Sequence, residues 1–247
     1  MEKYFNIRYE FDKDVVQERI ALKTTDQGTG YICVADANIL QQVHNDLDYR
    51  KVVNGSMFSI CDSSWVPIFI NWIYGIKHEH YCGSMIFKDI IEQKRYRQFF
   101  MGTSAEVLTA LKANLTKIDP AIKGMTFYEL PFCKVEEFDY PAIAEMVNSD
   151  NPDIIWVALG APKQEIFMSK LNPHLNRGVQ IAVGAAFKFY SGLEEKRAPK
   201  WMRRMHLEFV YRIYAEPKKQ WARCKQIIYT LPSIFKEEVK RKNNNSI

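Results

Sequence analysis

Short apolar runs alternate with segments of helical spacing from residue 31 to residue 191. Each apolar run has five or six residues and is bounded by polar or turn residues, which is typical of strands. We predict strands at residues 31–35, 57–61, 97–101, 125–130, 153–158 and 178–183. The segments between them predict helices at residues 38–45, 65–74, 107–115 and 162–171, the third preceded by capping-box spacing from Thr103 to Glu106. This alternation favours an α/β fold with a mostly parallel sheet and helices on both faces.

Two apolar segments carry more information than the rest. Asp153–Ala158 is almost entirely apolar between Pro152 and Gly160, as expected of a central parallel strand. Trp65–Ile76 is the longest apolar segment, but it is interrupted by polar and proline residues and is shorter than the roughly 18 residues that span a bilayer. We therefore predict a buried helix there.

The pattern changes to helix alone after Gly192. Four apolar residues at helical spacing form a stripe: Met202, Met205, Phe209 and Ile213. Pro217 ends this run, and we predict a second, basic helix from there to about Tyr229. The terminal KRKNNNS is expected to fray. We therefore divide the chain into a domain of residues 1–192 and a helical C-terminal appendage of residues 193–247.

Charge is distributed unevenly between these two parts. Residues 196–247 contain fourteen Lys/Arg and four Asp/Glu, a net charge of +10, whereas residues 1–195 carry a net charge of −5. A basic tail on an acidic body favours an anionic partner, which is a membrane surface, a phosphate group or nucleic acid.

The remaining composition is that of a globular protein kept in a reducing compartment. The chain is 47% apolar and 26% charged, which excludes disorder as its main state. Its five cysteines are odd in number and contain no C-x-x-C pair, so we predict core cysteines rather than a disulfide framework or a zinc site.

Ligands of open parallel sheets bind beyond the carboxyl ends of the strands. Small, polar or helix-starting residues follow the predicted strands there: Asp36, Asn38, Asp62, Ser63, Gly102, Thr103, Gly160 to Gln164, and Gly184. Exposed N–H groups at helix starts favour a phosphate or diphosphate. Asp62 could act as a general base on a hydroxyl group or simply cap the next helix, and its position alone favours the cap.

Other short motifs give weaker signals. Gly28-Thr-Gly30 precedes its strand, so it does not match a dinucleotide fingerprint. Asp46-Leu-Asp48 has the D-x-D spacing of some metal-dependent sugar transferases, but its polar surroundings favour solvated surface. The H-x-H pair His78 and His80 is also predicted to be loop surface. We predict neither a metal site nor a cofactor.

Three linked motifs resemble the WecG/TagA/CpsF family of glycosyltransferases. Gly160-Ala-Pro-Lys-Gln-Glu165 is similar to the family's G-x-P-x-Q-E segment. Val183-Gly-Ala-Ala-Phe187 is similar to the segment that follows it. Arg197-Ala-Pro-Lys-Trp201, with Leu207 to Arg212 and Glu216-Pro217, is similar to the C-terminal signature. Order and spacing agree from about residue 31 to residue 225.

The resemblance implies a Rossmann-like body and a C-terminal appendage that completes the site and meets the membrane. It implies an inverting, metal-independent transfer of an N-acetylmannosamine-type sugar from a UDP-sugar to a polyprenyl-diphosphate-linked sugar, in bacterial surface polysaccharide synthesis. The expected location is peripheral, on the cytoplasmic face of the cell membrane.

The same resemblance assigns roles to individual residues. Asp62 matches the proposed general base and Gln164 the active-site glutamine, and we take both as catalytic. Asn38 matches a family asparagine, and Arg212 and Arg223 are candidates for appendage arginines that contact phosphate. Phe132 could stack on uracil or belong to the core. The predicted substrate-binding residues are Asp36, Asn38, Gly102, Thr103, Phe132, Gly160, Pro162, Gly184, Lys188, Arg204, Arg212 and Arg223.

Some positions depart from the family pattern, which leaves alternatives open. Asp36 replaces a threonine, Ser63 and His206 replace glycines, and Lys188 replaces an aspartate. A catalytically idle relative, retained as a binding or scaffold subunit, is therefore the second hypothesis. A nucleic-acid binder is weaker, because the tail aromatics follow helical core spacing rather than a stacking platform. The apolar stripe of the appendage is a candidate surface for self-association.

Overall fold

The computed structural model describes residues 2–63, 65–193, 202, 211, 214 and 217–244. Its centre is an eight-stranded sheet in the order β1-β2-β4-β3-β8-β7-β5-β6. Only the β1–β2 pair is antiparallel among the pairings of the described sheet. The strands are β1 (Glu2–Tyr4), β2 (Ile7–Tyr9), β3 (Thr29–Ala35), β4 (Phe58–Cys61), β5 (Gln98–Gly102), β6 (Thr126–Tyr128), β7 (Ile154–Ala158) and β8 (Gly178–Ala182). The predicted α/β class is confirmed.

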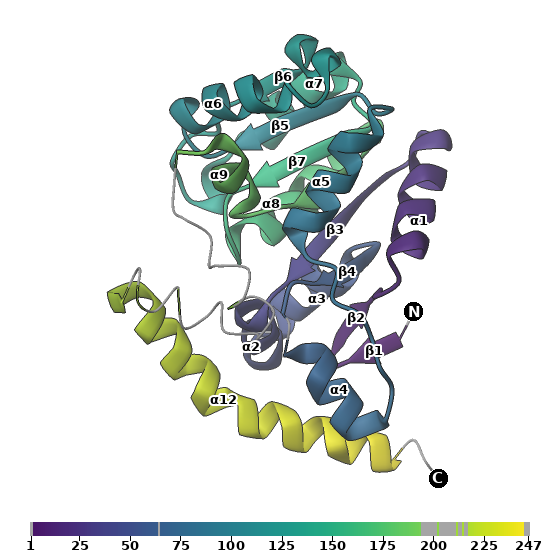
Figure 1. The fold of residues 1–247 in the computed structure, drawn as a ribbon, viewed down its shortest axis with the longest axis vertical. Helices are drawn as coiled ribbons and strands as arrows, with labels where there is room; N and C mark the ends of the chain where they lie inside the picture. Colours follow the sequence, from purple (N-terminus) through teal and green to yellow (C-terminus); the bar gives the residue numbers. More distant parts are fainter. Residues whose placement is uncertain are drawn as a thin grey trace.

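Helices connect the strands and cover both faces of the sheet (Figure 1). The α-helices are α1 (Lys13–Thr25), α2 (Ala37–Asn45), α3 (Leu47–Gly55), α4 (Val66–Tyr74), α5 (Gly83–Gln93), α6 (Ala105–Leu115), α7 (Tyr140–Asp150), α8 (Lys163–Leu171), α9 (Ala186–Ser191) and α12 (Pro217–Asn244). Short 3₁₀ turns are η1 (Pro120–Gly124), η2 (Val135–Glu137) and η3 (Asn172–His174). In the described part of the chain, none of the helices combines the length and hydrophobicity needed to cross a bilayer.

The chain leaves the neighbouring strands β3 and β8 toward opposite faces of the sheet. After β3 it forms α2 and α3, and α3 packs against α8 on one face. After β8 it forms α9, which packs against α5 and α6 on the other face. Adjacent strands whose connections diverge in this way form a topological switch point, where open α/β sheets bind ligands.

The sheet interior is apolar apart from a few polar side chains. Every residue of β4, β5, β7 and β8 is buried. Trp156 is fully buried and its indole N–H donates a 2.7 Å hydrogen bond to Gln98 Oε1 on the neighbouring strand. Three of the cysteines are buried, as predicted: Cys33, Cys61 and Cys82, whereas Cys133 is only half-buried.

The predicted end of the last helix is wrong. Helix α12 does not stop near Tyr229 but continues through Pro232 to Asn244, and in Figure 1 it extends past α2 and α4. Contacts with the body explain its length. Glu238 is 3% exposed and its carboxylate accepts hydrogen bonds from Tyr74 of α4, at 2.9 Å, and from Arg241. Residues 240–244 of the stretch expected to fray are therefore helical and held by the body, and its last two residues lie outside the described part.

Two further expectations are corrected. Ser104, not Thr103, is the N-cap of α6, because Thr103 has a left-handed φ of +53°. Helix α4 is only partly buried, since Trp72 is 68% exposed. The predicted division of the chain near Gly192 remains a prediction, and most of the predicted Met202–Ile213 stripe lies outside the described residues.

Candidate functional site

The predicted site residues lie in a row along the carboxyl edge of the sheet. Ala35 of β3 pairs with Cys61 of β4, so Asp36 and Asp62 are the first residues beyond two neighbouring strands. The backbone N–H of Asp62 donates a 3.0 Å hydrogen bond to the carbonyl of Ala35. The row continues with Gly184 in the turn after β8, Gly160 in the turn after β7 and Gly102 at the end of β5.

Asp62 is exposed beyond the end of β4, and its side chain does not cap the following helix. Trp65 is the N-cap residue of α4 and makes no side-chain cap hydrogen bond. Asp62 Oδ1 instead accepts a 2.8 Å hydrogen bond from the backbone N–H of Gly83, the first residue of α5. The alternative of a cap for the next helix is therefore wrong. The carboxylate is held by α5 at a position that solvent reaches.

Asp36 acts as a helix cap. Its Oδ1 accepts hydrogen bonds of 2.9 Å from the N–H groups of Asn38 and Ile39 at the start of α2. Asp36 and Asn38 are both half-buried. Because a carboxylate already occupies these two N–H groups, the start of α2 is not available as a phosphate cradle while Asp36 holds this position.

Gln164 is 4% exposed and lies between the turns that follow β7 and β8. Its Oε1 accepts a 3.0 Å hydrogen bond from the N–H of Gly160, and its Nε2 donates a 2.9 Å hydrogen bond to Glu165 Oε1. Gly184 lies alongside, because a Cβ added there would stand 3.9 Å from Gln164 Oε1. The structure therefore brings Gly160, Gln164 and Gly184 together.

Sequence reasoning missed the partner of this glutamine. Glu165 is fully buried, and its Oε2 accepts a 3.1 Å hydrogen bond from the hydroxyl group of Tyr49 in α3. Burial raises the pKa of Glu165 to about 7, and the nearby charge of Asp36 contributes in the same direction. The sequence shows Glu165 only as the last letter of a motif, and Tyr49 is 116 residues distant along the chain.

Backbone geometry distinguishes the end of β5 from the turn after β7. Gly102 has a φ of +105°, and a Cβ there would lie 2.5 Å from the carbonyl oxygen of Ala158. Gly160 also has a positive φ, +77°, but faces open space. The Ala161–Pro162 peptide bond is cis. Helices α6 and α8 begin at this edge, and neither N-cap residue, Ser104 or Pro162, makes a side-chain cap hydrogen bond. In α8 the N–H of Gln164 donates a 3.0 Å hydrogen bond to the carbonyl of Gly160.

The other predicted residues are more scattered. Phe132 is fully exposed in the loop after β6, with the Lys163 ammonium 5.8 Å from its ring centre, so a role in the core is wrong. Lys188 is half-buried in α9. Arg204 and Arg212 lie outside the described residues. Arg223 lies in α12, but its side chain is outside the described part as well.

The D-x-D segment has a structural role. Asp46 caps α3 through the N–H groups of Asp48 and Tyr49, and Asp48 forms an exposed ion pair of 2.8 Å with Lys51. This agrees with the prediction of solvated surface. Among the described residues, no group of three or more His, Cys, Asp or Glu side chains is placed to hold a metal ion.

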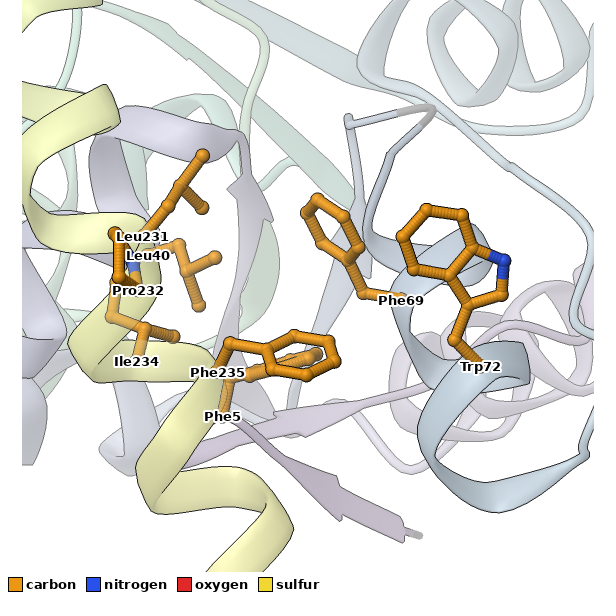
Figure 2. A pocket seen from close by; sticks show the side chains of 8 residues that line it. All are labelled: Phe5, Leu40, Phe69, Trp72, Leu231, Pro232, Ile234 and Phe235. Atoms are coloured by element: carbon orange, nitrogen blue, oxygen red, sulfur yellow. The ribbon is translucent and has the colours of Figure 1, made fainter.

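An apolar groove lies beside the β3–β4 end of the row. Its volume is about 410 Å³. Figure 2 shows Phe69 and Trp72 of α4 facing the residues that α2 and α12 contribute. The lining residues are Phe5, Leu40, Phe69, Trp72, Leu231, Pro232, Ile234 and Phe235. Because α2 and α4 start shortly after Asp36 and Asp62, the groove adjoins the carboxyl edge.

Comparisons with known proteins agree with this geometry. The model of the glycosyl transferase WecG/TagA/CpsF family matches residues 5–244. The N-acetylglucosaminyldiphosphoundecaprenol N-acetyl-beta-D-mannosaminyltransferase of Bacillus subtilis (strain 168) is 29% identical over 200 residues, which cover 80% of this chain and 75% of the relative. The protein of the same name from Bacillus spizizenii is 28% identical over 223 residues, 88% of this chain and 84% of the relative. The chain belongs to the WecG/TagA/CpsF family and is a glycosyltransferase.

Proposed function

We propose that this glycosyltransferase moves an N-acetylmannosamine-type sugar from a UDP-sugar to a polyprenyl-diphosphate-linked sugar, with inversion and without a metal ion. The names of both Bacillus relatives contain such an acceptor and a β-linked product. A β-linked product is what inversion of an α-linked nucleotide sugar gives. The observation that carries the proposal is the exposed Asp62 carboxylate at the switch-point edge, held by α5.

Inversion at the anomeric carbon needs one base. The acceptor hydroxyl attacks as its proton leaves, and the bond to the nucleotide diphosphate breaks on the opposite side. Asp62 is the proposed base, because the hydrogen bond from Gly83 orients its carboxylate while the side chain stays exposed. Gln164 lies between the turns after β8 and β7, which stand two and three positions from β4 in the sheet, so it is proposed to bind the donor rather than to take this proton.

The departing UDP accumulates negative charge on its β-phosphate. The N–H groups at the start of α6 are donors at the same edge, and helix starts favour anions. Arg204, Arg212 and Arg223 are proposed to add positive charge from the appendage. Phe132 is proposed to stack on uracil, because its exposed ring follows β6 at this edge. Lys188, whose side chain in α9 is half-buried, is proposed as a further donor contact.

The apolar groove is proposed to receive the first part of the acceptor's polyprenyl chain. Aromatic and aliphatic side chains from three helices line it, and a hydrocarbon chain is the part of the acceptor that gains from such a site. The basic C-terminal region is proposed to lie on an anionic membrane surface, on its cytoplasmic face, where both substrates meet. Self-association remains a prediction.

Transfer measured with purified protein tests this function. UDP-sugars that differ at C2 and in the N-acetyl group are offered with a short-chain lipid-diphosphate N-acetylglucosamine, in the presence of EDTA. Mass spectrometry identifies the product and NMR its anomeric configuration. We expect a β-linked N-acetylmannosamine product. Binding of UDP-sugar without transfer or hydrolysis would instead support the catalytically idle relative.

A further inference from the structure

The carboxyl group of Glu165 lies in an environment that disfavours its ionised form. It is fully buried, and within the described part of the chain no Lys or Arg forms an ion pair with it. The buried Asp119 caps η1, and the buried Glu238 pairs with Arg241, so both have an evident structural role. A buried carboxylate without a cation destabilises a fold by several kcal/mol in general, so its presence calls for another explanation.

The partners of Glu165 indicate that explanation. One oxygen accepts a 2.9 Å hydrogen bond from Gln164 Nε2, and the other accepts a 3.1 Å hydrogen bond from the Tyr49 hydroxyl. Tyr49 is itself only 4% exposed in α3. An ionised carboxylate only accepts hydrogen bonds, so both neighbours must act as donors. Tyr49 thus holds Glu165 in place from an element that lies outside the β7–α8 turn.

This arrangement leaves the amide of Gln164 one favourable orientation. Its oxygen faces the N–H of Gly160 at 3.0 Å, and its nitrogen faces the carboxylate. Rotating the amide by 180° would place oxygen against oxygen at the ionised Glu165 carboxylate and N–H against N–H at Gly160. Both contacts would be repulsive. The amide then presents a fixed donor and acceptor beside Gly184.

We propose that Glu165, held by Tyr49, is a positioning residue that orients the Gln164 amide toward the nucleotide-sugar donor. The inference rests on the proposed function, in which Gln164 contacts the donor. Glu165 touches neither substrate and acts only through Gln164. Its buried carboxylate therefore serves to exclude the flipped amide, which would offer the donor the wrong hydrogen-bonding groups.

A double-mutant cycle tests this role. Glu165→Leu removes the acceptor, and we expect it to lower transfer about tenfold, in the same kinetic parameter that Gln164→Ala changes. Glu165→Gln keeps an oxygen that can face Gln164, so it should restore most of the activity. In a Gln164→Ala background, Glu165→Leu should change transfer by less than about twofold, because the amide that Glu165 orients is absent. Glu145→Gln, on the exposed side of α7, is the matched control.

Each outcome supports or overturns the inference. An equal loss from Glu165→Leu with and without Gln164 would show that Glu165 does not act through it. Failure of Glu165→Gln to restore activity in a folded protein would also contradict the proposal. If Glu165→Leu does not fold, the same cycle is measured with Tyr49→Phe, which removes one hydroxyl group. Absence of transfer by the unmodified chain would refute the proposed function but not the orientation of the Gln164 amide. The hydrogen-exchange protection of the Gly160 N–H reports that orientation separately.

Discussion

The backbone N–H of Gly83 donates a 2.8 Å hydrogen bond to Asp62 Oδ1, which joins the first residue of α5 to the side chain that follows β4. Glycine is important for this approach. A Cβ at Gly83 would lie 3.0 Å from Val34 Cγ1 and 3.7 Å from Asp62 Oδ1. The start of α5 therefore lies against both β3 and the proposed base, and its position determines where the carboxylate stands.

Gly83→Ala should consequently impair transfer more than stability. The added methyl group requires Val34 or the start of α5 to shift by a few tenths of an ångström, and a shift of α5 moves the proposed base with it. We expect the rate of transfer to fall about tenfold. Gly124→Ala is the matched control, because a Cβ there meets no atom within 4 Å. Equal rates for the two variants, with melting temperatures near that of the unmodified protein, would argue against this role of Gly83.

Alanine substitutions at Gly102 and Gly160 distinguish the effect of steric overlap on stability from the effect of backbone strain. Both have a positive φ, so alanine at either position incurs roughly 1–2 kcal/mol of strain. Gly102→Ala also places a Cβ 2.5 Å from the carbonyl oxygen of Ala158, whereas Gly160→Ala faces open space. We expect Gly102→Ala to lower the free energy of unfolding by about 2 kcal/mol more than Gly160→Ala, as measured by urea denaturation. Equal losses would contradict the close packing of β5 against β7.

The parts of the fold that could be predicted were those with a strong local pattern. The strands β3, β4, β5, β7 and β8 are buried on both faces, so each is a mainly apolar run in the sequence, with single polar residues at Ser59, Gln98 and Gln180. Helix α1 lacks such a pattern, because only Val16, Ile20 and Thr24 are buried in its thirteen residues. Strands β1 and β2 have three residues each, too few for a period to show.

The site was predictable as a set of positions but not as a set of contacts. Motif spacing placed Asp62 and Gln164 at the ends of strands. That Asp62 is held by Gly83, 21 residues away, and Glu165 by Tyr49, 116 residues away, follows only from how α5 and α3 pack on the sheet. Likewise, the sequence predicted that α4 is buried but could not show the groove that it lines. That groove depends on where the distant helix α12 packs.

Stability should depend on pH through Glu165. Burial raises its pKa from 4.5 to about 7, so the folded protein binds this proton more tightly than the unfolded chain. The contribution of this bound proton to the free energy of unfolding is complete below pH 4.5. It falls by about 3 kcal/mol as the pH rises to about 7. Glu165→Gln removes it. Urea denaturation at pH 5 and pH 8 should therefore show a smaller loss with rising pH for the variant, and identical losses would refute the assignment.

The groove can be tested without touching the polar site. Trp72 is 68% exposed and lines the groove, so Trp72→Ser should fold normally yet remove apolar contact area. We expect the KM for a polyprenyl acceptor to rise about tenfold, with no change for an acceptor that carries a short alkyl chain. Leu47→Ser is the control, since Leu47 is 66% exposed on α3 and does not line the groove. An equal effect on both acceptors would exclude lipid binding there.

The most direct test of the account is the Asp62→Asn variant, with Asp48→Asn as an exposed control of the same chemistry. Asparagine keeps the shape of the side chain and its contact with Gly83 but cannot take a proton from the acceptor. Transfer and donor binding are measured side by side on the purified protein. We expect transfer to fall at least about a hundredfold while UDP-sugar affinity stays within about twofold. Turnover close to that of the unmodified enzyme would show that Asp62 is not the base.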